Sequence, residues 1–467
     1  MSNLKDDIKL RTRYGVRMRN QAALIFCLTP LLLTVLLASM NAQTETNWQK
    51  TYGGSGKDFG WSVQQTLDGG YVIVGYTNSF GAGGYDVYLV KTDAYGNQLW
   101  QRTYGGTGND FGWSVQQTSD GGYIIVGYTR PFITDDYDVY LVKTDASGNQ
   151  LWQMTYGGTG NDLGWSVKQT SDGGYIIAGS TGSFGAGSSD VYLVKTDSSG
   201  KLLWQKTYGG VNSDGGYSVQ QTSDGGYVIV GDTWSFGAGG DDVYLVKTDA
   251  SGDQLWQMTY GGTGDDFGYS IQQTSDGGYV IAGWTNLFGA GGYDVYLVKT
   301  DSSGKLLWQR TYGGTGNDYG RYVQQTSDGG YVIAGYTNSF GAGGDDVYLI
   351  KTDASGNQLW QMTYGGRGDD FGYSVQQTSD GGYVIAGSTS SFGIGYEDIY
   401  LIKTDVSGNT SVQVGSNGTG LQTTALAGGL QTPFLLYGAL CGLIVLILVV
   451  ILLGNKYRIK FTRKDKN

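Results

Sequence analysis

A 52-residue unit repeats along the chain without insertion or deletion, and this repeat limits the possible folds more than any other feature. A tryptophan marks each unit, at Trp48, Trp100, Trp152, Trp204, Trp256, Trp308 and Trp360. Each complete unit contains four runs typical of β-strands, which we label A to D; one set begins at Phe111, Gly122, Asp138 and Leu151. Four antiparallel strands in about 50 residues are typical of one propeller blade.

The repeat begins and ends out of phase. Seven sets of runs A, B and C are present, and the last set ends at Asp405 with no D run after it. The missing run stands before the first set, as Trp48–Tyr52. We therefore predict an all-β fold, a single seven-bladed β-propeller with four antiparallel strands per blade, closed by the N-terminal strand.

The two ends of the chain carry membrane signals. The apolar stretch Ala22–Leu37 predicts a signal peptide over residues 1–42, with Met18 as an alternative start or the segment retained as an anchor. The propeller is expected over residues 43–410 and a flexible Gly/Ser/Thr-rich stalk over 411–432. Residues 433–454, uncharged throughout, predict a transmembrane helix, and the basic tail 455–467 predicts a single-pass type I protein of the cell membrane, with the propeller extracellular and the tail cytoplasmic.

Composition excludes some partners and chemistries. Residues 43–432 carry 38 Asp and Glu against 18 Lys and Arg, so this segment repels phosphate backbones and a nucleic-acid partner is not expected. The two cysteines, Cys27 and Cys441, lie in the apolar ends, so the middle of the chain forms no disulfide. The chain has no histidine, which removes the most frequent general base and transition-metal ligand.

Two stretches carry a family resemblance. The sequence "DVYLVKTDASGNQLWQMTYGG", residues 138–158, resembles the strand–turn–strand of the tryptophan-docking repeat in quinoprotein (PQQ-like) propellers, and "GGYVIAGYT", residues 329–337, is similar to the double-glycine strand of kelch repeats. Over residues 48–405 the unit resembles the tandem propeller repeats of archaeal and bacterial cell-surface proteins. The resemblance implies that the seven D-run tryptophans dock on a neighbouring blade. It does not imply the quinoprotein cofactor, because the vicinal cysteine pair of that family is absent.

The repeated aspartates in the A–B and C–D links are expected to form hairpin turns through their side chains. Calcium is the alternative, since this cation prefers carboxylate oxygens. The candidates for it are paired acids in the B–C links: Asp135, Asp136, Asp241, Asp242, Asp345 and Asp346, together with Glu397 and Asp398. Otherwise no cofactor is expected.

Two positions vary between blades while the scaffold of the repeat does not. The first, near the start of run A, is occupied by Trp61, Trp113, Trp165, Tyr217, Tyr269, Arg321 and Tyr373. The second follows the run-B glycine and is occupied by Tyr76, Tyr128, Ser180, Asp232, Trp284, Tyr336 and Ser388. In one hypothesis the first set rims the mouth of the central channel as a ligand site, with Arg321 as a polar anchor. In the other hypothesis these rings pack between blades.

The sequence favours a cell-surface binding or adhesion propeller that presents a face to a carbohydrate or protein ligand. A passive structural component of the cell envelope is the alternative, since the blades are nearly identical. An extracellular enzyme of glycosidase or quinoprotein type is less favoured, because no carboxylate pair differs from its copies in the other blades. We therefore predict no catalytic residues.

Overall fold

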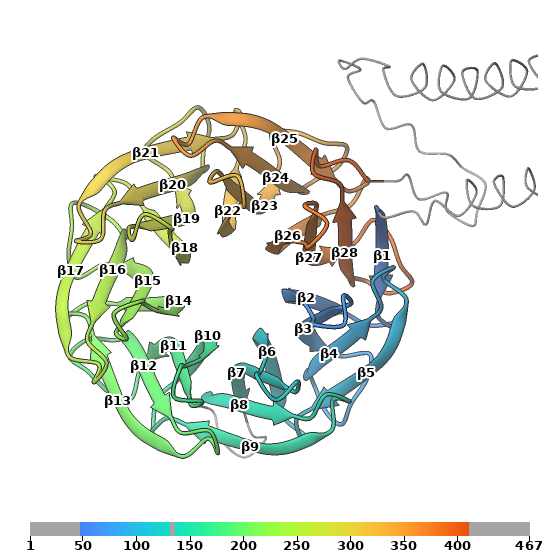
Figure 1. Ribbon diagram of the computed structural model, residues 1–467, viewed down its shortest axis with the longest axis horizontal. Helices are drawn as coiled ribbons and strands as arrows, with labels where there is room; N and C mark the ends of the chain where they lie inside the picture. Colours follow the sequence, from blue (N-terminus) through green and yellow to red (C-terminus); the bar gives the residue numbers. More distant parts are fainter. Residues whose placement is uncertain (1–46, 131–135, 411–467) are drawn as a thin grey trace, which may run out of the picture. The chain divides into compact units, whose positions relative to one another are not determined.

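The computed structural model describes residues 47–130 and 136–410, which form seven four-stranded antiparallel sheets around a central channel (Figure 1). Strand A of each blade lies next to the channel and strand D at the outer rim. This confirms the predicted seven-bladed propeller.

The strand bounds repeat with the 52-residue period. The A strands are β2 Asp58–Gln65, β6 Asn109–Gln117, β10 Asp162–Gln169, β14 Asp214–Gln221, β18 Asp266–Gln273, β22 Asp318–Gln325 and β26 Asp370–Gln377. The B strands are β3 Tyr71–Thr77, β7 Tyr123–Arg130, β11 Tyr175–Thr181, β15 Tyr227–Thr233, β19 Tyr279–Thr285, β23 Tyr331–Thr337 and β27 Tyr383–Thr389. The C strands are β4 Asp86–Thr92, β8 Asp138–Thr144, β12 Asp190–Thr196, β16 Asp242–Thr248, β20 Asp294–Thr300, β24 Asp346–Thr352 and β28 Asp398–Thr404. The D strands are β5 Gln98–Tyr104, β9 Gln150–Tyr156, β13 Leu202–Tyr208, β17 Gln254–Tyr260, β21 Leu306–Tyr312, β25 Gln358–Tyr364 and β1 Trp48–Tyr52.

The ring closes through its first strand. β1 pairs antiparallel with β28, in a register that places Trp48 opposite Lys403 and Tyr52 opposite Ile399. The seventh sheet therefore has the order β1-β28-β27-β26, and its outer strand comes from the other end of the chain (Figure 1). The predicted closure is confirmed, and it leaves β28 with a partner along its outer edge.

The apolar core lies between neighbouring blades. Val72 and Leu89 of blade 1 share one cluster with Tyr123 and Val142 of blade 2, and corresponding clusters recur around the ring. Both faces of each B and C strand are covered, which explains their consecutive apolar residues. Each blade thus depends on its neighbours for burial.

The D-strand tryptophans contact the next blade. Their ring centroids lie 5.8–6.1 Å from the tyrosine that begins strand B of that blade, as Trp48 does from Tyr71. A Cβ on Gly96, whose φ is +73°, would lie 2.7 Å from the Trp48 ring, so the ring covers a position that only glycine fits. The Tyr52 hydroxyl donates to the Gly96 carbonyl at 2.7 Å. These are the contacts that a docking residue is expected to make.

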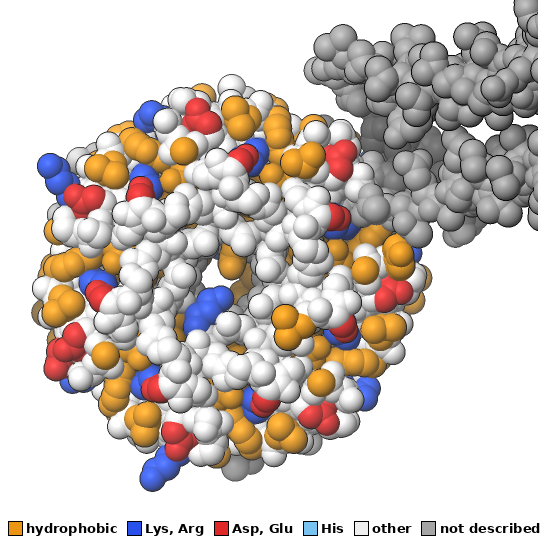
Figure 2. Space-filling view, viewed as in Figure 1, with side chains coloured by type: hydrophobic (Ala, Val, Ile, Leu, Met, Phe, Trp, Pro, Cys, Tyr) orange, Lys and Arg blue, Asp and Glu red, His pale blue; other side chains and the backbone are white. Residues whose placement is uncertain are grey.

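An ion pair between a buried lysine and an exposed aspartate, not foreseen from the sequence, also repeats in every blade. Lys91 is 3% exposed, and its Nζ lies 2.9 Å from the Asp68 carboxylate in the A–B turn. Although partial burial opposes ionisation of Asp68, hydrogen bonds from Thr66, Lys91 and Gly70 lower its pKa. Figure 2 shows the acidic and basic members side by side around the ring. The turn aspartates therefore shape the hairpin, as predicted, and also hold a strand-C lysine.

The remaining predicted segments, namely the signal peptide, stalk, transmembrane helix and tail, lie outside the described residues. Within residues 47–130 and 136–410 there is no helix long and apolar enough to cross a membrane.

Candidate functional site

The A strands surround a cavity of about 520 Å³ at the centre of the ring. All seven blades contribute to its wall. The lining side chains are chiefly aromatic rings, serine hydroxyls and glutamine amides, so the cavity combines ring faces with many hydrogen-bonding groups.

A β-bulge in each A strand supplies the aromatic part of this wall. In β2 the register with β3 shifts between Gly60 and Ser62, which leaves Trp61 as the extra residue. A Cβ on Gly60 would lie 2.9 Å from Ile399 and 3.0 Å from the Gly387 carbonyl of the adjoining blade. Glycine before the bulge thus lets the inner strand lie against its neighbour, while Trp61 lines the cavity.

All seven residues predicted at the channel mouth line the cavity: Trp61, Trp113, Trp165, Tyr217, Tyr269, Arg321 and Tyr373. The rings also contact one another from blade to blade. Centroid distances are 3.9 Å for Trp61 and Tyr373, 4.0 Å for Trp61 and Trp113, and 4.6 Å for Trp113 and Trp165. All seven side chains are partly exposed. The two hypotheses from the sequence therefore describe the same residues, since the rings pack against each other and face the cavity.

Arg321 is the one charged member of this set. Its guanidinium carbon lies 4.2 Å from the centroid of the Tyr269 ring, and its Nη2 donates to the Tyr336 hydroxyl at 2.8 Å. The guanidinium is thus held in place by an aromatic face in the neighbouring blade and a hydroxyl in its own blade.

The two variable positions form a pair within a blade, which the sequence analysis did not foresee. Trp165 Nε1 donates to Ser180 Oγ at 3.1 Å, and Trp284 Nε1 donates to the Tyr269 hydroxyl at 3.4 Å. The partners are always 15 residues apart, so a comparison of the two positions blade by blade could have found the pairing. The residue after the run-B glycine therefore contacts the cavity-lining residue of the same blade, and its type differs with the type of that residue.

Blade 4 departs from this pattern. It has Gly215 where blade 1 has Phe59, and Asp232 where blade 1 has Tyr76. Asp232 is 6% exposed, and its burial raises the pKa to about 7 against an opposing effect of the nearby Tyr217 hydroxyl. A Cβ on Gly215 would lie 3.0 Å from Asp232 Oδ1, so this glycine makes space for the carboxyl group.

Two of the calcium candidates have other roles in the structure. Asp242 Oδ2 accepts the Ala238 N–H at 2.8 Å, and Asp346 Oδ2 accepts the Ala342 N–H at 2.9 Å, so both cap their own B–C link. Among the residues that the structure describes, no group of three or more acidic, histidine or cysteine side chains could hold a metal ion. Asp135 lies outside those residues.

No protein-family model matches the chain. The regulatory protein FlaEY of Caulobacter vibrioides is 28% identical over 208 residues, which cover 37% of this chain. The match spans 22% of the length of FlaEY, well under two thirds of that protein.

Solved propellers are similar in architecture at low sequence identity. The WD40 domain of Pan2 from Neurospora crassa has a TM-score of 0.49 and 9% identity, and the match covers 79% of this chain and 98% of that domain. The extracellular domain of BT4673 from B. thetaiotaomicron has a TM-score of 0.42 and 12% identity, with coverage of 77% and 42%.

Proposed function

We propose that the protein is a binding module of the cell surface, which holds an extracellular ligand in the central channel and acts in recognition or adhesion. The cavity of about 520 Å³ carries this proposal, because it falls in the range of about 300–1,000 Å³ typical of ligand sites. Six aromatic side chains and one arginine line it at a single level of the ring. Aromatic faces stack on sugar rings or apolar groups, while an arginine fixes orientation.

The variation between blades supports binding over a purely structural role. A passive ring needs seven equivalent blades, and the chain keeps its docking tryptophans and Lys–Asp pairs unchanged. Among the positions that differ are those that line the cavity and those that support them. A ligand without sevenfold symmetry is bound best when different blades present different side chains to it.

Trp113→Ala tests the binding role. In a screen of the full-length protein against a glycan array and candidate proteins, we expect the variant to lose at least about tenfold in affinity for the ligand that the wild type selects, because a ring face is removed. The thermal midpoint should change by no more than about 2 °C, since the Trp113 ring lines the cavity and does not belong to the apolar core between blades. A variant that melts several degrees lower and binds normally would assign the ring to packing alone.

The surface location is proposed from the charge pattern at the two ends of the sequence. If the tail at 455–467 is cytoplasmic, protease added to intact cells should remove the propeller and leave a membrane fragment that contains residues 434–467. A protected propeller with a digested tail would reverse the topology.

A further inference from the structure

A second ring of side chains lines the same cavity, three residues further along each A strand. Six blades have glutamine there, and its Oε1 accepts a backbone N–H of the next blade at 2.5–2.7 Å. The acceptors are Gln64, Gln116, Gln220, Gln272, Gln324 and Gln376. Because a strand rises about 3.3 Å per residue, this glutamine ring lies about 10 Å along the strand from the aromatic ring.

Blade 3 interrupts the glutamine ring with Lys168. An ammonium group cannot accept a hydrogen bond, so the Gln221 N–H of blade 4 lacks the acceptor that its six counterparts have. Within residues 47–130 and 136–410, the Lys168 ammonium has no acidic partner. A positive charge therefore lines the cavity in blade 3, and the neighbouring strand of blade 4 has an N–H donor without the glutamine acceptor of the other blades.

The cavity has a different charge from the surrounding protein. Its lining includes Lys168 and Arg321, on blades three apart in a ring of seven, and no lining residue is a carboxylate. Residues 43–432 as a whole are strongly acidic. Figure 2 shows a basic side chain inside the channel opening. An anionic group is thus disfavoured over most of the surface and favoured in the channel.

We infer that the channel binds an acidic carbohydrate, with a sugar carboxylate placed between the Lys168 ammonium and the Gln221 N–H and the sugar rings placed against the aromatic ring. The carboxylate would supply the acceptor that glutamine supplies in the other six blades, with a charge added. This inference rests on the proposed function and names the class of its ligand.

The inner strand edges argue against an acidic peptide as the ligand. An extended peptide binds a strand edge through free backbone N–H groups. Here the Val115 N–H donates to Ser62 Oγ at 3.4 Å and the Gln117 N–H to Gln64 Oε1 at 2.6 Å, so side chains of the previous blade already occupy the edge. Serine hydroxyls and glutamine amides remain in the wall to meet sugar hydroxyls.

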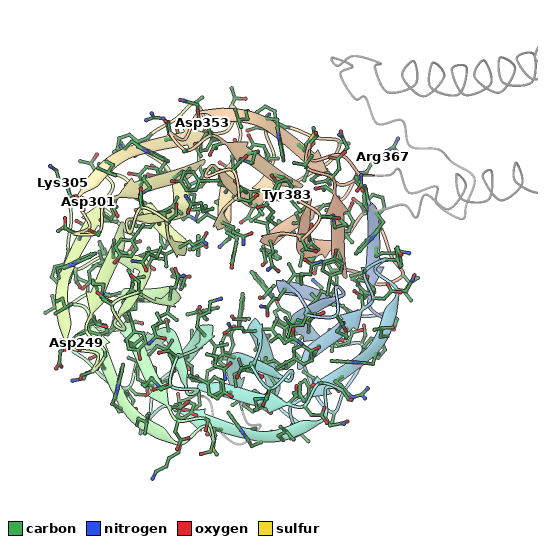
Figure 3. All side chains as sticks on the ribbon, in the orientation of Figure 1. Asp249, Asp301, Lys305, Asp353, Arg367 and Tyr383 are labelled. Atoms are coloured by element: carbon green, nitrogen blue, oxygen red, sulfur yellow. The ribbon has the colours of Figure 1, made fainter. Side chains whose placement is uncertain are left out.

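Lys168→Gln tests the inference, because it installs the residue that the other six blades carry and should fold as the wild type does. The probes are trigalacturonate and its uncharged methyl ester, titrated into the full-length protein by calorimetry. We expect the wild type to bind the acid at least about tenfold more tightly than the ester. Lys168→Gln should bind both with the weak affinity of the ester. The control Lys305→Gln removes the same charge from the outer rim and should behave as the wild type (Figure 3).

Each contrary result is distinct. Equal binding of acid and ester by the wild type would overturn the inference and leave the proposed function intact. If both variants lose binding of the acid, the binding depends on the net charge of the protein and not on Lys168, and the proposed site is wrong. Binding of pentaglutamate, dependent on Lys168, without binding of either saccharide would assign the channel to acidic peptides and reject the carbohydrate.

Discussion

Deletion of residues 43–53 is expected to open the ring and to lower the stability of the propeller by at least about 5 kcal/mol. The deletion removes Trp48 and Tyr52, which are 5% and 6% exposed, together with the whole pairing of β1 to β28. It also leaves the edge of β28 free to pair with another molecule. We expect a much lower thermal midpoint and concentration-dependent aggregation, measured by calorimetry and light scattering.

Deletion of residues 43–46 alone is the matched control, because it keeps β1. This control should melt and remain monodisperse as the full chain does. If the longer deletion also melts as the full chain does, the ring is not held closed by β1.

Trp204→Ala should have the largest effect of any single substitution considered, a loss of about 3 kcal/mol in the free energy of unfolding. The Trp204 ring lies 5.9 Å from Tyr227 of the next blade and against the Gly252 turn, so its removal leaves a cavity at a blade interface. Urea unfolding followed by circular dichroism measures the effect.

Trp234→Ala makes the same substitution on a ring that is 59% exposed in a B–C link. Its midpoint should shift little. Equal losses from Trp204→Ala and Trp234→Ala would contradict a docking role for the D-strand tryptophans.

The architecture could be predicted from the sequence because it follows from a constant period. Blade number, strand order and the origin of the seventh blade's outer strand all depend on counting runs from Trp48 to Asp405. That residues such as Trp61 face the channel could be predicted for the same reason, since strand A is the inner strand.

The Lys–Asp pairs and the glutamine hydrogen bonds between blades could not be predicted, because they are contacts between residues distant in sequence. The Lys91–Asp68 pair spans 23 residues, and in the sequence Lys91 is simply a polar residue at the end of an apolar run. Lys168 was visible as the one lysine in a column of glutamines. The significance of Lys168 follows from the hydrogen bonds that the glutamines accept from the next blade. Periodicity alone does not reveal these hydrogen bonds.

The most direct test of the central claim is a crystal structure of the protein with the ligand selected by the array. Our account predicts density for the ligand in the central cavity, with a ring against Trp61, Trp113 or Trp165 and a polar group within hydrogen-bonding distance of Arg321 or Lys168. A ligand bound at the outer rim or on the B–C links, with the cavity unchanged, would contradict it.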